Sequence, residues 1–212
     1  MLKIDNYEVT GWEHTIRGAR NPLNSWHRMD SSYGFNVNGL ENQALLGPND
    51  YKLLKKLTNA GSDHGKFMRM ITVYVDITAP LYWWKEFDTY KIGTVANSCS
   101  TMHKIHAKEF EMSDFSNENL NEKSLCILRM VIDELNECRN DYLKTKDKED
   151  WWQMIQLLPS SYNQKRTIML NYEVLKNMYN SRRHHKLDEW HTLCDWIELL
   201  PYHDFITGET YE

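Results

Sequence analysis

Residues 70–77, Met-Ile-Thr-Val-Tyr-Val-Asp-Ile, carry the strongest strand signal in the chain. Their β-branched and aromatic side chains fit a pleated, half-buried surface. Pro80 follows shortly afterwards, where the first turn of a helix would begin, and it predicts a helix that runs to about Tyr90. A strand that leads directly into a helix requires a fold that contains both kinds of element.

Helical periodicity dominates the rest of the sequence. From Asn121 to Leu143, apolar residues recur at spacings of three and four, which is typical of a long amphipathic helix. Asn49 and Asp50 are suited to cap another helix, which would end near Gly61. The elements predicted elsewhere are a strand over 3–10, helices over 12–19, 149–158, 166–181 and 186–199, and irregular segments over 21–48 and 93–102. Few strands and many helices indicate an α+β fold.

Composition excludes several classes of protein. The 212 residues are 41% hydrophobic and carry a formal charge of -5, so we expect one globular domain over residues 1–212. A net acidic chain does not suit a protein that coats nucleic acid. The sequence contains neither a signal peptide nor an apolar run of about 18 residues, so we expect no membrane partner. The four cysteines are scattered, which suits reduced thiols, and we expect a cytoplasmic protein.

Aromatic residues are unusually common, with 8 Trp and 12 Tyr. Large rings with a polar edge are favoured in cores, in subunit interfaces and in pockets for flat ligands. The aromatic residues therefore fit a core with an oligomer interface, and they also fit a pocket for a planar ring.

Histidines and basic residues gather near residue 185. His184 and Asp188 stand four residues apart, as do His185 and Glu189, a spacing that serves either metal binding or ordinary helix-stabilising pairs. The neighbouring Arg182 is followed by another arginine, and this pair suits either an anion site or a solvated basic patch.

Two other segments carry reactive or charged side chains with open roles. Cys99 precedes His103 and His106, and is either a nucleophile activated by a histidine or an inert thiol in a binding loop. The irregular segment 21–48 and the residues just before it carry basic side chains that are either solvated or contact phosphate groups, namely Arg17, Arg20, His27 and Arg28.

The segment Ile71–Tyr82, with Ala79-Pro80 at the start of a helix, resembles the flavin-dependent thymidylate synthases. In that family the helix carries Arg-Gln, followed by Arg-His-Arg and a loop of the form Ser-x-Asn-Glu-x-Ser-x-Arg. Counting from Pro80, Lys85 and Glu86 fall on Arg-Gln, and Thr89, Tyr90 and Lys91 fall on Arg-His-Arg. With one inserted residue, the loop's Asn, Glu, Ser and Arg are matched by Asn97, Ser98, Ser100 and Met102.

A second segment matches the family without gaps. Leu158-Pro159 resembles the family's Leu-Pro, and the residues that follow at family spacing are Asn171, Leu175, Asn177 and Arg182. Glu173 stands where the family usually has a basic residue, and Asp188 or Glu189 stands near the family's Gln. The resemblance covers roughly residues 50–200.

The resemblance implies a curved, mostly antiparallel sheet flanked by long helices, and a homotetramer with active sites between subunits. It implies a methyltransferase that acts on dUMP with methylenetetrahydrofolate and with a hydride from FAD, which NADPH reduces. No catalytic side chain is assigned, and no metal is expected. The residues implied on the flavin side are Asn171, Asn177, Tyr90 and Lys91, and those implied on the substrate side are Arg182, Glu86, Asn97, Ser98 and Ser100.

Several residues differ from the family pattern in their chemistry. An arginine binds phosphate or a carbonyl through a planar fork, whereas Lys91 offers a point charge and Thr89 offers none. Tyr90 can stack or donate one hydrogen bond, and Glu86 puts an acceptor, or a charge, where the family's amide would read a base edge. Three hypotheses follow: a divergent enzyme acting on dUMP or a related pyrimidine nucleotide, a homologue that only binds a nucleotide between subunits, and a structural protein with an aromatic interface.

Overall fold

The computed structural model describes residues 2–34 and 43–208. The chain divides into two compact units, which share the strands of one sheet. Unit 1 comprises the described residues of 1–3, 77–89 and 97–166, and unit 2 comprises those of 4–76, 90–96 and 167–212. The expectation of a single domain over 1–212 stays a prediction.

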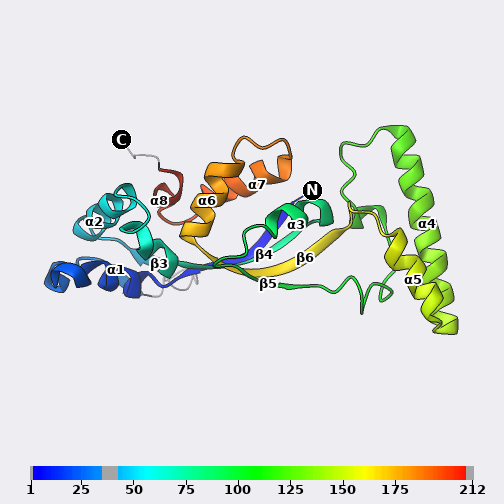
Figure 1. Ribbon diagram of the computed structural model, residues 1–212, viewed down its shortest axis with the longest axis horizontal. Helices are drawn as coiled ribbons and strands as arrows, with labels where there is room; N and C mark the ends of the chain where they lie inside the picture. Colours follow the sequence, from blue (N-terminus) through cyan, green and yellow to red (C-terminus); the bar gives the residue numbers. More distant parts are fainter. Residues whose placement is uncertain (1, 35–42, 209–212) are drawn as a thin grey trace. The chain divides into compact units, whose positions relative to one another are not determined.

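The main sheet has four strands in the order β1-β4-β6-β5 (Figure 1). Their bounds are β1 Lys3–Thr10, β4 Thr72–Pro80, β5 Val95–Ser98 and β6 Asn163–Asn171. Along β4 the buried side chains alternate, with Val73 and Val75 fully buried and Tyr74 exposed between them. Asp76 accepts hydrogen bonds from Asn6 on β1 and from Thr167 on β6, and so joins three adjacent strands. The mixed helix-and-strand fold with an antiparallel sheet confirms the predicted fold class.

Unit 1 is built on a pair of helices and a buried apolar cluster. Its helices are α3 Leu81–Phe87, η4 Met112–Asp114, α4 Glu122–Thr145 and α5 Lys148–Leu157. Helices α4 and α5 lie side by side (Figure 1) and enclose Leu128, Ile132, Leu135 and Met154. Asn121 caps α4 by accepting from the Ser124 backbone N–H at 3.0 Å, as its position in the sequence predicts.

Unit 2 contains the remaining helices and a short two-stranded sheet. Its elements are α1 Trp12–Arg20, η1 Asn21–Leu23, η2 Trp26–Arg28, β2 Ser32–Gly34, β3 Gln43–Leu45, α2 Pro48–Asn59, η3 Gly65–Met70, α6 Tyr172–Arg182, α7 Asp188–Ile197 and α8 Asp204–Thr207. Strands β2 and β3 pair antiparallel, with Ser32 opposite Leu45. Rings from α1, from α6 and from the turn before α8 meet in the core, with Trp12 edge-on to Tyr172 at 5.5 Å and to Tyr202 at 5.2 Å.

The predicted helix over 166–181 is wrong in its first third. Residues up to Asn171 form β6, and the helix begins only at Tyr172. Ile168 and Leu170 are buried while Thr167 is exposed, and this alternation of two is the period of a strand. The spacing of Leu170 and Val174 also fits one helix face, and this coincidence extended the prediction across the true boundary.

Three smaller predictions also need correction. Segment 93–102 contains β5, and segment 21–48 contains η1, η2, β2 and β3, while residues 35–42 lie outside the described residues. Helix α2 begins at Pro48, with Gly47 as its N-cap, instead of being capped by Asn49 and Asp50. The proline can occupy the first helical turn because its missing N–H would have had no helical partner.

The two roles predicted for Arg20, a solvated charge or a phosphate contact, both require an exposed side chain. Arg20 is instead buried. Its buried guanidinium donates to Asp50 through Nε at 2.7 Å. Asp50 also accepts from the backbone N–H groups of Asp30 and Ser31, both at 2.9 Å. Arg17, His27 and Arg28 are exposed.

Candidate functional site

Helix α6 carries the three residues that match the resemblance most closely. Asn171 is its N-cap, and the Oδ1 atom accepts from the Val174 backbone N–H at 3.0 Å. Asn177 is exposed near the middle of the helix, and Arg182 is its last residue. Asn171 accepts a hydrogen bond from a backbone N–H that has no partner within the helix. The positive charge of Arg182 interacts favourably with the helix dipole at the C-terminal end.

The loop after α3 passes close to the start of α6. Gly93 has a φ of 79°, and a Cβ atom at this position would lie 3.0 Å from Asn171 Nδ2 and 3.1 Å from a Val174 methyl group. A glycine adopts this backbone conformation without strain and leaves room for this approach, whereas a Cβ atom would press on both neighbours. The close approach brings the Asn171 amide beside the loop that carries Tyr90 and Lys91.

Arg182 lies against two aromatic rings that also contact each other. Its Nε donates to the Tyr90 hydroxyl oxygen at 3.0 Å. Its Cζ lies 4.7 Å from the centre of the Trp190 ring and 5.6 Å from the centre of the Tyr90 ring. The two rings are 6.1 Å apart, and the side chain is half-buried. The guanidinium is thus held in one orientation by a hydrogen bond at its edge and by aromatic contact on its face.

This arrangement is compatible with phosphate recognition. Aromatic stacking uses the face of a guanidinium, whereas phosphate oxygens are bound by the N–H groups in its plane. A guanidinium whose orientation is already fixed loses less conformational entropy when it binds an anion.

The adjacent basic residue points to a different ring. Arg183 Cζ lies 5.2 Å from the centre of the Tyr179 ring, and the Tyr179 hydroxyl donates to Glu198 at 2.6 Å. The sequence pair Arg182-Arg183 is therefore not one basic cluster, and only its first member lies against Tyr90 and Trp190.

The histidine pairs are not on one helix. His184 and His185 lie in the turn between α6 and α7, and only Asp188 and Glu189 are helical. His191 Nδ1 lies 3.8 Å from Asp188 as an ordinary pair three residues apart. Within residues 2–34 and 43–208, no group of three or more His, Cys, Asp or Glu side chains is placed to hold a metal ion.

The other predicted substrate residues belong to unit 1. Glu86 is half-buried on α3, and Asn97 and Ser98 are exposed on β5. Ser100 Oγ accepts from the backbone N–H groups of Met102 and His103, at 3.1 and 2.9 Å, and so shapes the following turn. Tyr90, Lys91, Asn171, Asn177 and Arg182 belong to unit 2.

Both backbone polar groups of Cys99, its N–H and its carbonyl, form hydrogen bonds with residues of β6. Its N–H donates to the Lys165 carbonyl at 2.9 Å, and its own carbonyl accepts from Gln164 Nε2 at 2.7 Å. In the described part of the chain, no hydrogen bond joins the Cys99 thiol to His103 or His106. The geometry favours the inert-thiol alternative over an activated nucleophile.

Two residues of this site were missed by sequence reasoning. Trp190 forms one wall around Arg182, and Gly93 allows the approach to Asn171. In the sequence, Trp190 appears only as an aromatic residue that follows Arg182 after a turn. Its contact with Arg182 depends on how α7 packs against α6, which the sequence does not show. Gly93 carried no local signal beyond its place in a polar loop.

Comparison with known proteins identifies the class of fold. No protein-family model matches the sequence, and no curated protein sequence matches it. Solved structures do match along almost the whole chain. Thymidylate synthase X (ThyX) from Helicobacter pylori, with FAD and dUMP, superposes with a TM-score of 0.69 at 17% identity, covering 99% of this chain and 98% of that one.

A second structure of the H. pylori flavin-dependent thymidylate synthase ThyX, complexed with FAD and dUMP, matches with a TM-score of 0.65. Identity is again 17%, and the match covers 98% of this chain and 97% of the other. The fold of this protein is therefore the fold of ThyX. No described helix is long and apolar enough to cross a membrane.

Proposed function

We propose that this protein is a divergent flavin-dependent thymidylate synthase-like enzyme. In this proposal it methylates dUMP or a related pyrimidine nucleotide, using methylenetetrahydrofolate as the carbon donor and NADPH as the source of reducing equivalents. The fold shared with ThyX over nearly the full chain supports the class. Function as a homotetramer belongs to the same proposal.

One observation carries the assignment: Arg182 donates to Tyr90 and packs against Trp190 at the end of the helix that Asn171 begins. In the proposed enzyme, Arg182 binds the nucleotide phosphate, since an oriented guanidinium binds phosphate oxygens as a fork. Glu86, Asn97, Ser98 and Ser100 are the further residues proposed to contact the nucleotide.

The residues around the start of α6 fit a flat ring system. The amide of Asn171 faces the tight loop at Gly93, and Asn177 is exposed further along the same helix. Tyr90 offers a ring surface, and Lys91 offers a cation for a pyrophosphate or a ring carbonyl. We propose that these four side chains, Asn171, Asn177, Tyr90 and Lys91, hold FAD. The flavin, when bound, would supply the hydride, and the protein would orient the rings and exclude water from them.

A second candidate is a homologue that binds a nucleotide without catalysis. It is favoured by the replacement of Arg-His-Arg by Thr89-Tyr90-Lys91, which removes two forked donors. Moreover, Tyr90 already accepts a hydrogen bond from Arg182, so its oxygen takes part in positioning the arginine.

The first test is flavin and substrate binding by matched arginine variants. Purified protein with added FAD should show the flavin absorbance near roughly 450 nm in the protein fraction. It should also form dTMP from dUMP, methylenetetrahydrofolate and NADPH. Arg182→Ala should weaken dUMP binding by about 10- to 100-fold, because a charge-assisted phosphate contact is lost.

Arg183→Ala is the control, since this neighbour contacts Tyr179 instead, and it should bind dUMP like the wild type. Protein that retains dUMP binding but not FAD would support the second candidate. Equal dUMP affinity in Arg182→Ala and wild type would refute the phosphate role of Arg182 in both candidate functions.

A further inference from the structure

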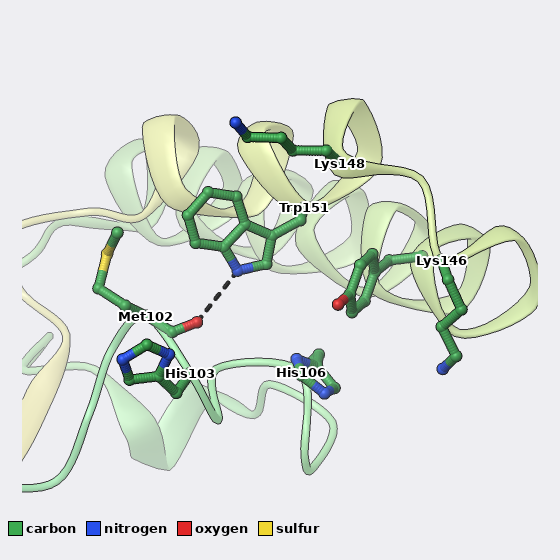
Figure 2. A pocket seen from close by; sticks show the side chains of 7 residues that line it. Met102, His103, His106, Lys146, Lys148 and Trp151 are labelled. Carbon is green, nitrogen blue, oxygen red and sulfur yellow. Dashed lines mark hydrogen bonds between the residues drawn. The ribbon is translucent and has the colours of Figure 1, made fainter.

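A cavity of 290 Å³ lies where α4 ends and α5 begins (Figure 2). All of its lining residues belong to unit 1, and they are Met102, His103, His106, Tyr142, Lys146, Lys148 and Trp151. None of them is among the residues proposed above to hold FAD or the nucleotide. The cavity is therefore a feature that the proposed function leaves unexplained.

The two walls of the cavity are joined by specific contacts. Trp151 Nε1 donates to the Met102 carbonyl at 3.0 Å, which ties the loop to α5, as Figure 2 shows. Arg139 Nε donates to the His106 carbonyl at 3.0 Å, which ties the same loop to α4. The His106 ring meets the Tyr142 ring at 4.9 Å. These contacts place the lining side chains on elements that are already held together.

His106 has a buried ring nitrogen, Nδ1, that lacks a hydrogen-bond partner among the described residues. A buried nitrogen without a partner is unfavourable, and such exceptions often mark a site where a ligand or ion supplies the partner. An imidazole can place its proton on Nδ1, so this atom can donate to an anion.

Two cations stand at the edge of the same cavity. Lys146 Nζ lies 5.5 Å from the Tyr142 ring centre, and Lys148 Nζ lies 6.0 Å from the Trp152 ring centre. Over residues 2–34 and 43–208, neither ammonium group forms an ion pair with a carboxylate. In Figure 2 both lysines extend from the α4–α5 side with Trp151, while His103 and His106 lie on the facing loop. Lysine side chains are flexible enough to turn toward an anion between these walls.

The turn geometry fixes the backbone from which one of these cations extends. Lys146 has a φ of 60° and ends α4, and its N–H donates to the Tyr142 carbonyl at 2.9 Å. A lysine in the left-handed region is uncommon, because glycine or asparagine normally occupies such a C-terminal position. Backbone preference does not explain the residue type at this position, whereas a cation at the C-terminal end of α4 is favoured by the helix dipole and is also available to an anion in the cavity.

We propose that this cavity binds a small aromatic phosphate monoester. The imidazoles and ammonium groups match a phosphate dianion, and the indole of Trp151, the Tyr142 ring and the Met102 thioether provide surface for a flat ring. The volume lies just below the usual range for small-molecule sites, which suits a single ring and excludes a dinucleotide.

Phenyl phosphate, inorganic phosphate and phenol separate the contributions of ring and charge. In calorimetric titrations of the full chain, phenyl phosphate should bind at one such site about tenfold more tightly than either of the other two. His106→Phe keeps a ring against Tyr142 and removes the nitrogen, and Lys146→Met keeps the chain length and removes the charge. Each should weaken phenyl phosphate binding at least about fivefold.

Two control variants locate the binding. Lys123→Met removes an exposed lysine near the other end of α4, and Arg182→Ala removes the guanidinium of the proposed nucleotide site; both should bind phenyl phosphate like the wild type. Lys148→Met, at an exposed position, replaces His106→Phe should that variant fail to fold. The proposal is overturned by undetectable phenyl phosphate binding, by equal affinity for inorganic phosphate, or by unchanged affinity in the lysine and histidine variants. It is also overturned by loss of binding in Arg182→Ala, an outcome that would instead support the proposed function.

Discussion

Individual side chains in this protein acquire their roles from partners far away in the sequence. Arg182 and Arg183 are chemically identical neighbours, yet one is bound to a tyrosine 92 residues earlier and the other stacks on a ring of its own helix. Their different environments make them a matched pair for experiment, since the same substitution removes the same charge from two settings.

Asp50 is a fully buried carboxylate that forms an ion pair with Arg20. Burial raises its pKa, but hydrogen bonds from Ser31 and the Asp30 backbone, together with Arg20, lower that pKa more strongly. A carboxyl group with a depressed folded-state pKa stabilises the protein above its unfolded value of about 3.9, and this contribution disappears as pH falls through the folded-state pKa. Asp50→Asn should lower the free energy of unfolding at pH 7 by about 3 kcal/mol, because Arg20 loses its buried counter-charge.

Urea denaturation at several pH values measures this effect. Wild-type stability should decline on acidification below about pH 4, and the decline should be shallower in Asp50→Asn. Asp133→Asn, which changes an exposed aspartate of α4, should leave both stability and slope nearly unchanged. An identical acid dependence in Asp50→Asn and wild type would contradict the assignment.

Cys194 should be the least reactive of the four thiols. Burial raises the pKa of its thiol to about 11, whereas Cys99 and Cys126 are exposed. Because the thiolate is the reactive form, iodoacetamide at pH 8 should modify Cys194 at least about a hundredfold more slowly than these two. Peptide mass spectrometry after timed labelling measures the rates, and the difference should vanish in concentrated urea. Fast labelling of Cys194 in the native protein would show that α7 does not bury it.

At the scale of elements, the helices were more predictable than the strands. Helix α4 was predicted nearly to its ends, because its apolar period and its Asn121 cap are local properties of the sequence. Strand β6 was mistaken for part of a helix, because Leu170 fits both periods and only pairing with other strands decides between them. Strand β5 is exposed throughout and shows no apolar pattern, so residues 95–98 gave no basis for predicting a strand.

The junction between β1 and α1 depends on one glycine. Gly11 has a φ of 91°, and a Cβ atom there would overlap the Met70 carbonyl oxygen at the end of η3. Gly11→Ala should therefore lower the free energy of unfolding by at least about 2 kcal/mol, through backbone strain and the steric overlap together.

Gly61→Ala separates the two contributions. Gly61 also has a positive φ, of 95°, but a Cβ there would meet no atom within 4 Å. This variant should lose only about 1 kcal/mol, the usual cost of strain alone. Chemical denaturation of both variants gives the comparison, and equal losses would mean that Met70 moves aside without cost.

At the scale of the whole molecule, the chain forms two compact units that share the strands of one sheet. Unit 1 has its own apolar cluster, centred on the fully buried Leu135. Leu135→Ala should destabilise that cluster by about 2–5 kcal/mol, as is typical for a large core side chain. Hydrogen exchange should then speed up in α4 and α5 while α6 and α7 keep their protection. Equal acceleration in all four helices would show that the units unfold as one, as the prediction of a single domain requires.

The match to ThyX shows that two sequences with only 17% identity can form similar folds. Buried positions need an apolar residue of suitable size, and this requirement tolerates extensive substitution. A phosphate-binding guanidinium tolerates little substitution, because its geometry matters as well as its charge. Under the proposed function, Arg182, Asn171 and Asn177 are therefore the positions at which substitution should alter ligand binding most.

The sequence by itself determined the α+β class and most helices. These properties depend on periodicity, caps and spacing within a few turns of the chain. Tertiary structure alone decided the extent of β6, the burial of Arg20 against Asp50, and the pairing of Arg182 with Tyr90 and Trp190. Such contacts join residues that lie far apart along the chain, and their energies act only once packing has brought the residues together.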